Sequence, residues 1–312
     1  MQVRPLGSTG LTVTPLCIGT AALGNLPDQY GYEVGEPQAV ATMNRVFAGP
    51  ANFVDTSNNY GDGDSERRIG KALAEVGGLP AGFVLATKVD PLPGQSDFSG
   101  RRVRESVAES IERLGVDRLQ LIYLHDPERI SLDEAMSADG AVRALVRLRE
   151  EGIIGHLGVA GGPIDLMRRY LATGLFQAVI SHNRFTLIDQ SAEPLLADAV
   201  ERDVAFINAA PYGGGILVKG PEAQPKYRYE PAARPIIDRV KAMHKACAGH
   251  EVPLAAAALQ FSLREPRIAS TIVGISRPER IDQTLRFAEW PVPAVLWEEL
   301  APLITIGRNG VD

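Results

Sequence analysis

The sequence predicts one α/β domain folded as a (β/α)8 TIM barrel, and three observations carry that prediction. Eight short apolar runs recur along the whole chain of 312 residues. Most of these runs are continuously apolar, as expected of parallel strands that are buried on both faces. Helical patterns lie between them, and alternation of eight strands with helices over at least about 250 residues is typical of this barrel. Because no linker or break in composition divides the chain, residues 1–312 are assigned to a single domain.

The predicted strands follow the chain in order. They cover residues 16–20, 52–56, 83–89, 119–125, 156–160, 178–183, 205–211 and 270–275. Helical spacing of apolar residues is clearest at residues 65–76, where Ile69, Leu73 and Val76 share one face, and it recurs at residues 103–114, 142–149 and 253–263. Outside the barrel we expect an N-terminal β-hairpin of residues 3–6 and 11–15, a long loop at residues 213–232, and an extra C-terminal helix with a tail after Pro291.

Composition excludes several other classes of protein. The net charge is −6 and no basic run stands out, so no nucleic-acid partner is expected. The N-terminus lacks an apolar signal segment, and no apolar stretch approaches the ~20 residues of a membrane span. Cys17 and Cys247 lie far apart without metal-type neighbours, which fits a reducing compartment and no metal site. The chain is therefore expected to be cytoplasmic, without a membrane partner.

A doubly wound sheet is the alternative fold, but the G-x-G-x-x-G fingerprint that it would need for a dinucleotide is absent.

Four residues with reactive side chains stand at or just past predicted strand ends. Asp55, Lys88 and His125 end or follow three successive strands, and Tyr60 lies in the loop after Asp55. Taken alone, each residue has a simpler structural explanation, as a turn residue, a solvent-exposed strand end or a packing residue. In a barrel, however, all carboxyl ends of the strands face one mouth, so the four side chains would meet there. A phenol has a pKa near 10, a buried ammonium beside it lowers that pKa, and a carboxylate keeps the ammonium charged. The set predicts proton transfer to or from an oxygen.

The same residues carry a resemblance to the aldo-keto reductase family. Residues 55–66 resemble its segment D-T-A-x-x-Y-G-x-G-x-S-E, Ala86-Thr87-Lys88 resembles its lysine motif, and Tyr123-Leu124-His125 resembles its histidine motif. The likeness extends over nearly the whole chain. It implies a (β/α)8 fold and a nicotinamide cofactor, NAD or NADP, that is bound without a Rossmann domain. It also implies that Asp55, Tyr60, Lys88 and His125 are the catalytic residues.

The resemblance further implies which residues contact the cofactor. They come from the ends of the first, second and sixth predicted strands, from the end of the seventh strand and the segment after it, and from the late segment 274–284. The full set is Gly19, Thr20, Asp55, His182, Pro211, Gly213, Gly215, Leu217, Gly274, Ser276, Arg277, Arg280, Gln283 and Thr284. Members that prefer NADP often have Lys-Ser where this chain has Gly274-Ile275. Without that lysine a 2′-phosphate has one cation fewer to bind, which slightly favours NAD over NADP as the cofactor. NADP remains the alternative, because Arg277 and Arg280 are available to its phosphate.

The nicotinamide end of the expected site departs from the family pattern. Gly158-Val159-Ala160-Gly161-Gly162 replaces the usual G-V-S-N, His182 replaces a Gln, and Ala209 replaces a Tyr. In the family the Ser, Asn and Gln of this pattern hold the carboxamide group of the nicotinamide ring. We therefore expect His182 and backbone groups to hold part of that carboxamide in this protein. A packed core histidine is the alternative reading of His182.

Within the family, three segments are similar to sugar 1-dehydrogenases of the L-galactose and L-fucose (D-threo-aldose) type. They are residues 208–217, 227–232 and 252–261, and pyridoxal dehydrogenases share much of the same pattern. This implies a small sugar or carbonyl substrate and oxidation of the anomeric carbon of an aldose to a lactone. The alternatives are a broad aldehyde or ketone reductase, a pyridoxal dehydrogenase, and a non-catalytic subunit that senses the cofactor. The sequence leaves the oligomeric state open.

Overall fold

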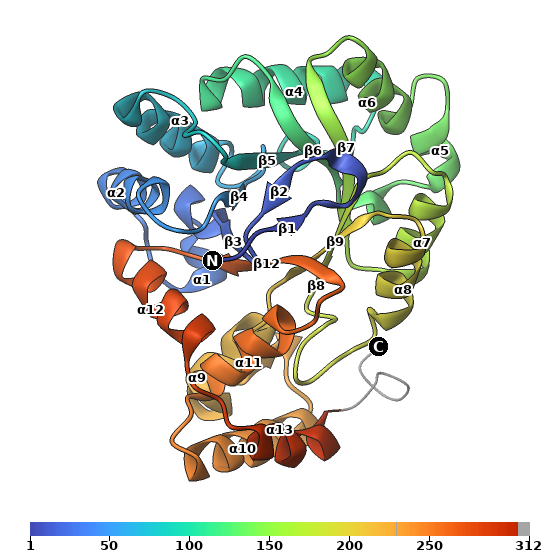
Figure 1. Ribbon diagram of the computed structural model, residues 1–312. Coiled ribbons are helices and arrows are strands. Elements are labelled where there is room, and N and C mark those ends of the chain that lie inside the picture. Colours follow the sequence, from blue (N-terminus) through green and yellow to red (C-terminus); the bar gives the residue numbers. More distant parts are fainter. Residues whose placement is uncertain (229, 305–312) are drawn as a thin grey trace.

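A closed barrel of eight parallel strands forms the centre of the computed structural model, which describes residues 1–228 and 230–304 (Figure 1). The strands follow one another around the barrel in the order β12-β3-β4-β5-β6-β7-β8-β9. Their bounds are β3 Leu16–Gly19, β4 Phe53–Asp55, β5 Val84–Val89, β6 Leu119–His125, β7 Ile154–Gly161, β8 Ala178–His182, β9 Ala205–Ala209 and β12 Ile268–Gly274. The predicted fold class is confirmed, and each predicted strand coincides with one of these eight.

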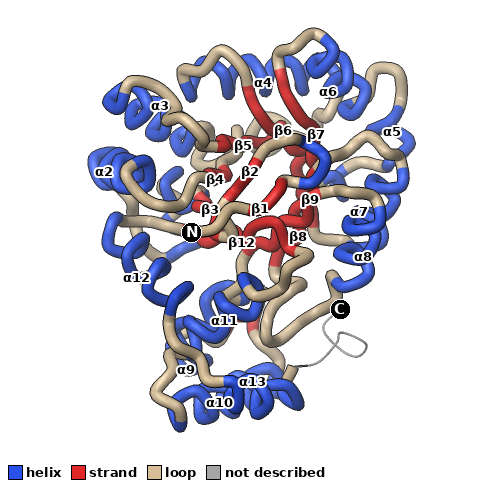
Figure 2. The backbone as a smooth tube through the Cα atoms, in the orientation of Figure 1, coloured by secondary structure: helices blue, strands red, loops and turns tan. Residues whose placement is uncertain are grey.

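A layer of helices surrounds the strands (Figure 2). It comprises α2 Glu36–Phe47, α3 Asp64–Val76, α4 Gly100–Leu114, α6 Ala141–Glu150, α7 Ile164–Ala172, α8 Glu193–Glu201, α11 Leu254–Leu263 and α12 Pro278–Glu289. The predicted helix at residues 65–76 is α3. Ile69 and Leu73 are buried as expected, but Val76 is 45% exposed. Val76 is the last residue of the helix.

Segments outside the barrel repeat agree with the prediction in part. The expected N-terminal hairpin is β1 Arg4–Pro5 with β2 Thr12–Val13, and the expected C-terminal helix is α13 Ala294–Leu300. The tail beyond residue 304, and Tyr229 within the segment 227–232, lie outside the described residues. Shorter or additional elements are α1 Pro27–Tyr30, α5 Leu132–Met136, α9 Ile216–Ala223, α10 Arg234–Gly249, β10 Lys226–Tyr227 and β11 Glu230–Pro231.

The long loop predicted at residues 213–232 was wrong, because this segment contains α9 and the paired strands β10 and β11. Three consecutive glycines with positive φ, residues 213–215, open the segment and read as a loop in the sequence. The apolar residues that follow them decide the structure. Ile216 and Leu217 are fully buried in a second apolar cluster together with α10 residues, and burial of that apolar area stabilises the short helix.

The N-terminal hairpin covers the amino-terminal end of the barrel. Arg4 donates hydrogen bonds from Nη1 to the carbonyl oxygen of Ile268 (2.6 Å) and from Nη2 to that of Leu263 (2.7 Å). Ser8 N donates to the carbonyl of Asp203, just before β9. With this end closed, the opposite mouth at the carboxyl ends of the strands is the one left for a ligand, as is usual for this fold.

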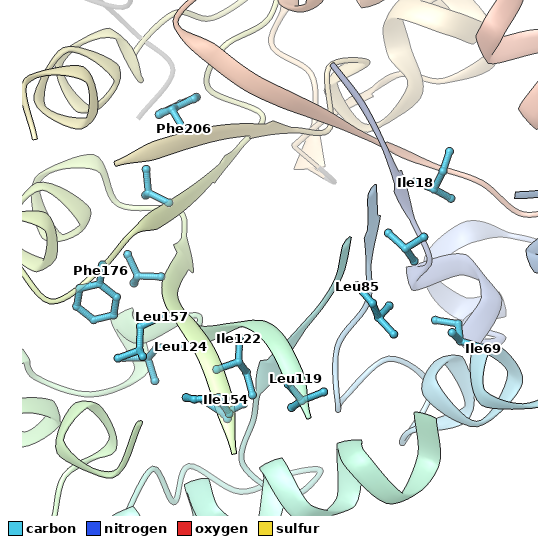
Figure 3. Close-up of a cluster of buried hydrophobic side chains, with 14 of the residues drawn as sticks. Ile18, Ile69, Leu85, Leu119, Ile122, Leu124, Ile154, Leu157, Phe176 and Phe206 are labelled. Carbon is cyan, nitrogen blue, oxygen red and sulfur yellow. The ribbon is translucent and has the colours of Figure 1, made fainter. Parts of the chain in front are cut away.

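Side chains alternate along each barrel strand between two apolar clusters. Outward residues such as Ile18, Leu85 and Ile122 pack between the strands and the helices (Figure 3). Inward residues fill the barrel, and they include Phe53, Val84, Ala86, Leu121, Tyr123, Ala178 and Ile180. Counting on in steps of two from these inward residues reaches Asp55, Lys88, His125 and His182. The alternation therefore places these four polar side chains on the inward face at the carboxyl-terminal mouth.

No helix among residues 1–228 and 230–304 is both long enough and apolar enough to pass through a lipid bilayer.

Candidate active site

The four predicted catalytic side chains meet at the carboxyl-terminal mouth of the barrel. Asp55 is the last residue of β4, Lys88 lies near the end of β5, and His125 is the last residue of β6. These strands are neighbours, because β4 pairs with β5 and β5 pairs with β6. Tyr60 lies in the turn between β4 and α3 and folds back over the mouth toward Lys88.

Lys88 is the hub of this cluster. Its side chain is 3% exposed, and its Nζ donates to Asp55 Oδ1 (2.7 Å), to the carbonyl oxygen of Thr56 (2.6 Å) and to the hydroxyl of Tyr60 (3.1 Å). An ammonium has three N–H donors, and all three are used. Burial alone would lower the pKa of Lys88, but Asp55 and Tyr60 raise it above its ordinary value. Lys88 is therefore a charged donor held in one position.

Asp55 gives the cluster its counter-charge. Burial raises the pKa of Asp55, and the ammonium of Lys88 opposes that rise. One carboxylate oxygen, Oδ1, accepts the hydrogen bond from Lys88. The other, Oδ2, is buried and has no hydrogen-bond partner among the described residues. A buried carboxylate oxygen without a donor is costly, so this atom is a fitting acceptor for a hydroxyl group of a bound ligand.

Tyr60 is held against Lys88 by two contacts. The ammonium lies 3.1 Å from the phenol oxygen and 4.6 Å from the ring centroid. Burial raises the pKa of Tyr60 to about 12, and Lys88 acts in the opposite direction. The expected lowering by Lys88 is therefore present, but burial outweighs it. In the protein without ligand Tyr60 is a phenol near neutral pH, which is the form that donates a proton.

His125 stands beside Tyr60 and is tied to a residue that sequence reasoning missed. The two rings are perpendicular, with centroids 6.1 Å apart and an interplanar angle of 84°. His125 Nδ1 lies 2.7 Å from Asp90 Oδ1, and Ser57 Oγ donates to Asp90 Oδ2. Burial alone would lower the pKa of His125, but Asp90, with a smaller contribution from Asp126, outweighs burial and raises that pKa above 6.5. The signal for Asp90 was its spacing, because it stands two residues after Lys88.

The first strand end lies where the cofactor was expected. Gly19 and Gly274 are paired in register between β3 and β12. A Cβ on Gly19 would meet Ile272 Cγ2 at 2.7 Å, so a side chain there would require Ile272 to move. Thr20 is fully buried, and its hydroxyl donates to the carbonyl oxygen of Asp55 (3.0 Å). Beside this strand end, the unpartnered Oδ2 of Asp55 is the acceptor that a hydroxyl group of the cofactor would use.

The remaining predicted cofactor residues divide into two groups. The first group lies at and just before the start of α12: Arg277 and Gly274 are exposed, and Ser276 is half-buried. In the first turn of this helix Arg280 donates a hydrogen bond to Gln283 (2.6 Å). A helix N-terminus favours the binding of an anion. Other members of the predicted set are buried within the protein, and they are Pro211, Gly213, Leu217 and Thr284. Gly215, beside them, is half-buried. Burial raises the pKa of Tyr212, and the charge of Arg280 opposes the rise.

His182 closes the other side of the mouth. Its Nδ1 lies 3.2 Å from Nδ2 of Asn183, and a Cβ on Gly162 would come within 3.5 Å of its Nε2. The ring therefore reaches the loop after β7, where the usual Ser and Asn are missing. Burial lowers the pKa of His182, so the ring is neutral near pH 7 and offers both a donor and an acceptor.

The fold is a parallel eight-stranded barrel whose carboxyl-terminal mouth brings together a buried phenol, an ammonium, a carboxylate and an imidazole. The model of the aldo/keto reductase family matches residues 15–303, and the chain belongs to that family. It is an NAD(P)-dependent oxidoreductase by that membership. A solved structure, a holo-form aldo-keto reductase from Bacillus halodurans, superposes with a TM-score of 0.80 at 24% identity and covers 100% of this chain and 99% of its own, which supports the fold.

Curated relatives cover nearly all of this chain. A D-threo-aldose 1-dehydrogenase from a Pseudomonas species is 32% identical, over 94% of this chain and 95% of its own length. An L-galactose dehydrogenase from Arabidopsis thaliana is also 32% identical, over 91% and 87%. A pyridoxal 4-dehydrogenase from Microbacterium luteolum is 30% identical, over 96% of both chains.

The position of Tyr60 depends on the glycine that follows it. Gly61 has φ +61°, and a Cβ there would lie 1.8 Å from the carbonyl oxygen of Gly24. Gly77 also has a positive φ, of +86°, but a Cβ there has no atom within 4 Å. We expect Gly77→Ala to lower the free energy of unfolding by ~1–2 kcal/mol, the cost of the left-handed conformation. Gly61→Ala should cost at least ~2 kcal/mol more, because the Gly24 peptide must move. Denaturant unfolding of both variants measures the difference, and equal losses would contradict this packing.

Proposed function

We propose that this protein oxidises the anomeric carbon of an aldose of the L-fucose or L-galactose type to a lactone, with NAD or NADP as the acceptor. The observation that carries the chemistry is the triple contact of Lys88 with Asp55, Thr56 and Tyr60 at the barrel mouth. The choice of substrate is supported by the two relatives named as an aldose and a galactose dehydrogenase, each 32% identical.

The proposed reaction removes a proton from the anomeric hydroxyl and a hydride from the same carbon. A bound nicotinamide would supply the hydride acceptor. Tyr60 takes the proton, and this requires its phenolate, which the ammonium of Lys88 stabilises. Asp55 keeps Lys88 charged, and His125 orients the sugar oxygen. In the reverse direction the phenol of Tyr60 gives its proton to a carbonyl oxygen, which is the form that its raised pKa favours.

A second candidate is oxidation of pyridoxal, supported by the pyridoxal 4-dehydrogenase at 30% identity. A steady-state assay separates the two. L-fucose, L-galactose and pyridoxal are each offered with NAD and with NADP, and reduced cofactor and lactone are both followed. The proposal expects kcat/KM for an aldose to exceed that for pyridoxal by at least about tenfold, a difference of ~1.4 kcal/mol. A higher value for pyridoxal, or no sugar turnover with either cofactor, contradicts it.

Tyr60→Phe tests the proposed proton carrier. The change removes the hydroxyl that contacts Lys88 and leaves the ring in place. We expect kcat to fall by at least ~10²-fold, since general acid–base catalysis contributes ~10²–10⁴ in rate. The dissociation constant of the cofactor should change little, and titration of the cofactor provides that control. Turnover within a few-fold of wild type would remove Tyr60 from its role.

The cofactor preference follows from the open position at Gly274. We expect NAD to bind at least as well as NADP, because Gly274 and the buried Ile275 offer neither an ammonium nor a hydroxyl for a 2′-phosphate. One charge-assisted hydrogen bond is worth roughly 1.5–3 kcal/mol, or about ten- to hundredfold in affinity. Exposed Arg277 and half-buried Arg280 keep NADP binding measurable.

Calorimetric titration of both oxidised cofactors measures that preference. The matched variant is Gly274→Lys, since a Cβ at Gly274 meets no atom within 4 Å. It should raise affinity for NADP by about tenfold and leave NAD nearly unchanged. If wild type binds NADP more than about thirtyfold tighter than NAD, a gap of roughly 2 kcal/mol, the two arginines suffice for the phosphate and the proposal is wrong.

A further inference from the structure

Asp90 is a buried carboxylate for which the four-residue mechanism has no use. It is the first residue after β5, and its side chain is fully buried. Among the described residues its carboxylate has two hydrogen-bond partners, Ser57 and His125. The backbone of Asp90 is held as well. Its N–H donates to Ser106 Oγ (3.3 Å), and its carbonyl oxygen accepts from Arg102 Nε (3.1 Å), both on α4.

The charges around Asp90 do not balance unless His125 is protonated. Lys88 is paired with Asp55 at 2.7 Å, and Arg102 donates from Nη1 and Nη2 to the carboxylate of Glu109, each at 2.7 Å. That leaves the ring of His125, with Nδ1 2.7 Å from Asp90 Oδ1, as the cation in contact with this carboxylate. A fully buried carboxylate without a cationic partner costs several kcal/mol, so the arrangement favours imidazolium.

The geometry also fixes which ring nitrogen serves a ligand. Nδ1 is directed at buried Asp90, while the side chain as a whole keeps 15% of its surface exposed. Nε2 lies 3.7 Å from Asp126 Oδ1, beyond hydrogen-bond distance. Other polar groups facing the ring are Tyr60, whose ring is perpendicular to it, Lys88, and His182, which is neutral. Nε2 is therefore the ring nitrogen that is available to a ligand at the barrel mouth.

We propose that Asp90 is a positioning residue: its carboxylate holds the Nδ1–H of His125, turns Nε2 toward the mouth, and stabilises the imidazolium as hydrogen-bond donor to the substrate oxygen. The proposal rests on the proposed function for its catalytic consequence. When Tyr60 takes the proton of a sugar hydroxyl, negative charge develops on that oxygen, and a charged Nε2–H donor stabilises it more than a neutral ring does. Ser57, which stands where the family segment D-T-A has Ala, completes the support with its hydroxyl.

The test begins with the free enzyme and needs no substrate. The titration of the imidazole rings is followed by NMR, and His125→Gln assigns the signal of His125 among the five histidines. In wild type the ring should titrate above pH 6.5, because Asp90 raises its pKa against the effect of burial. Asp90→Asn should lower that pKa by at least about one unit and bring it below 6.5, since burial then dominates; charge partners typically shift a pKa by about 1–3 units.

Two control variants isolate the carboxylate. Asp126→Asn removes the more exposed charge near Nε2 and should shift the pKa less than Asp90→Asn does. Ser57→Ala removes a donor but keeps the Asp90 charge, so the ring should still titrate above pH 6.5. If Asp90→Asn fails to fold, the pKa of His125 is measured in wild type and in Asp90→Glu instead, and these two titrations test the proposal. A wild-type ring that titrates below 6.5, or an unchanged pKa in Asp90→Asn, overturns the proposal.

The catalytic arm uses whichever substrate turns over. In the kcat/KM–pH profile, the limb that follows the His125 titration should move to lower pH in Asp90→Asn by the same amount as the NMR pKa. An unmoved limb alongside a shifted NMR pKa would mean that the ring charge has no role in the reaction, and the positioning role would be refuted. Failure of every sugar would refute the proposed function alone, because the NMR result does not depend on it.

Discussion

The ion pair between Lys88 and Asp55 is the interaction on which the site depends. Both side chains are almost fully buried, and taking two charges out of water costs several kcal/mol per ion. That cost is offset when every donor is used, and Lys88 uses all three on Asp55, Thr56 and Tyr60. The pair therefore contributes position more than stability, because it fixes the phenol of Tyr60 at a single point beside a cation.

The barrel supplies this arrangement through the alternation of its strands. Inward positions recur every two residues, which places Asp55 and Lys88 inside the barrel at the ends of β4 and β5. Ser57 and Asp90 each follow two residues later, in the loops just past those strands. The two strands are neighbours in the barrel, and these side chains meet in two layers. The first layer pairs Asp55 with Lys88, and the second pairs Ser57 with Asp90. Tyr60 completes the first layer and His125 the second, and each layer holds one of the two groups that would meet a substrate oxygen.

How much of this the sequence could predict follows from the range of each interaction. Strands such as 83–89 and 119–125 were predictable because a continuous apolar run reports burial on both faces. Lys88 and His125 were predictable because strand ends share one mouth.

Asp90 was missed because its partner is distant in sequence, and an Asp before a Pro reads as a turn residue. α9 was missed because three glycines masked the buried Ile216 and Leu217 that stabilise it. The raised pKa of Tyr60 was missed because burial is a property of the folded chain.

A double-mutant cycle on Lys88 and Asp55 tests the central claim that the pair and Tyr60 act as one unit. Lys88→Met, Asp55→Asn and the double variant are compared by kcat/KM, with circular dichroism and cofactor titration as controls for folding and binding. The account predicts strong coupling: the double variant should be no slower than Lys88→Met alone, since Asp55 acts through Lys88. Losses that simply add, so that the double variant is slower than either single variant by the full product of their effects, would contradict it.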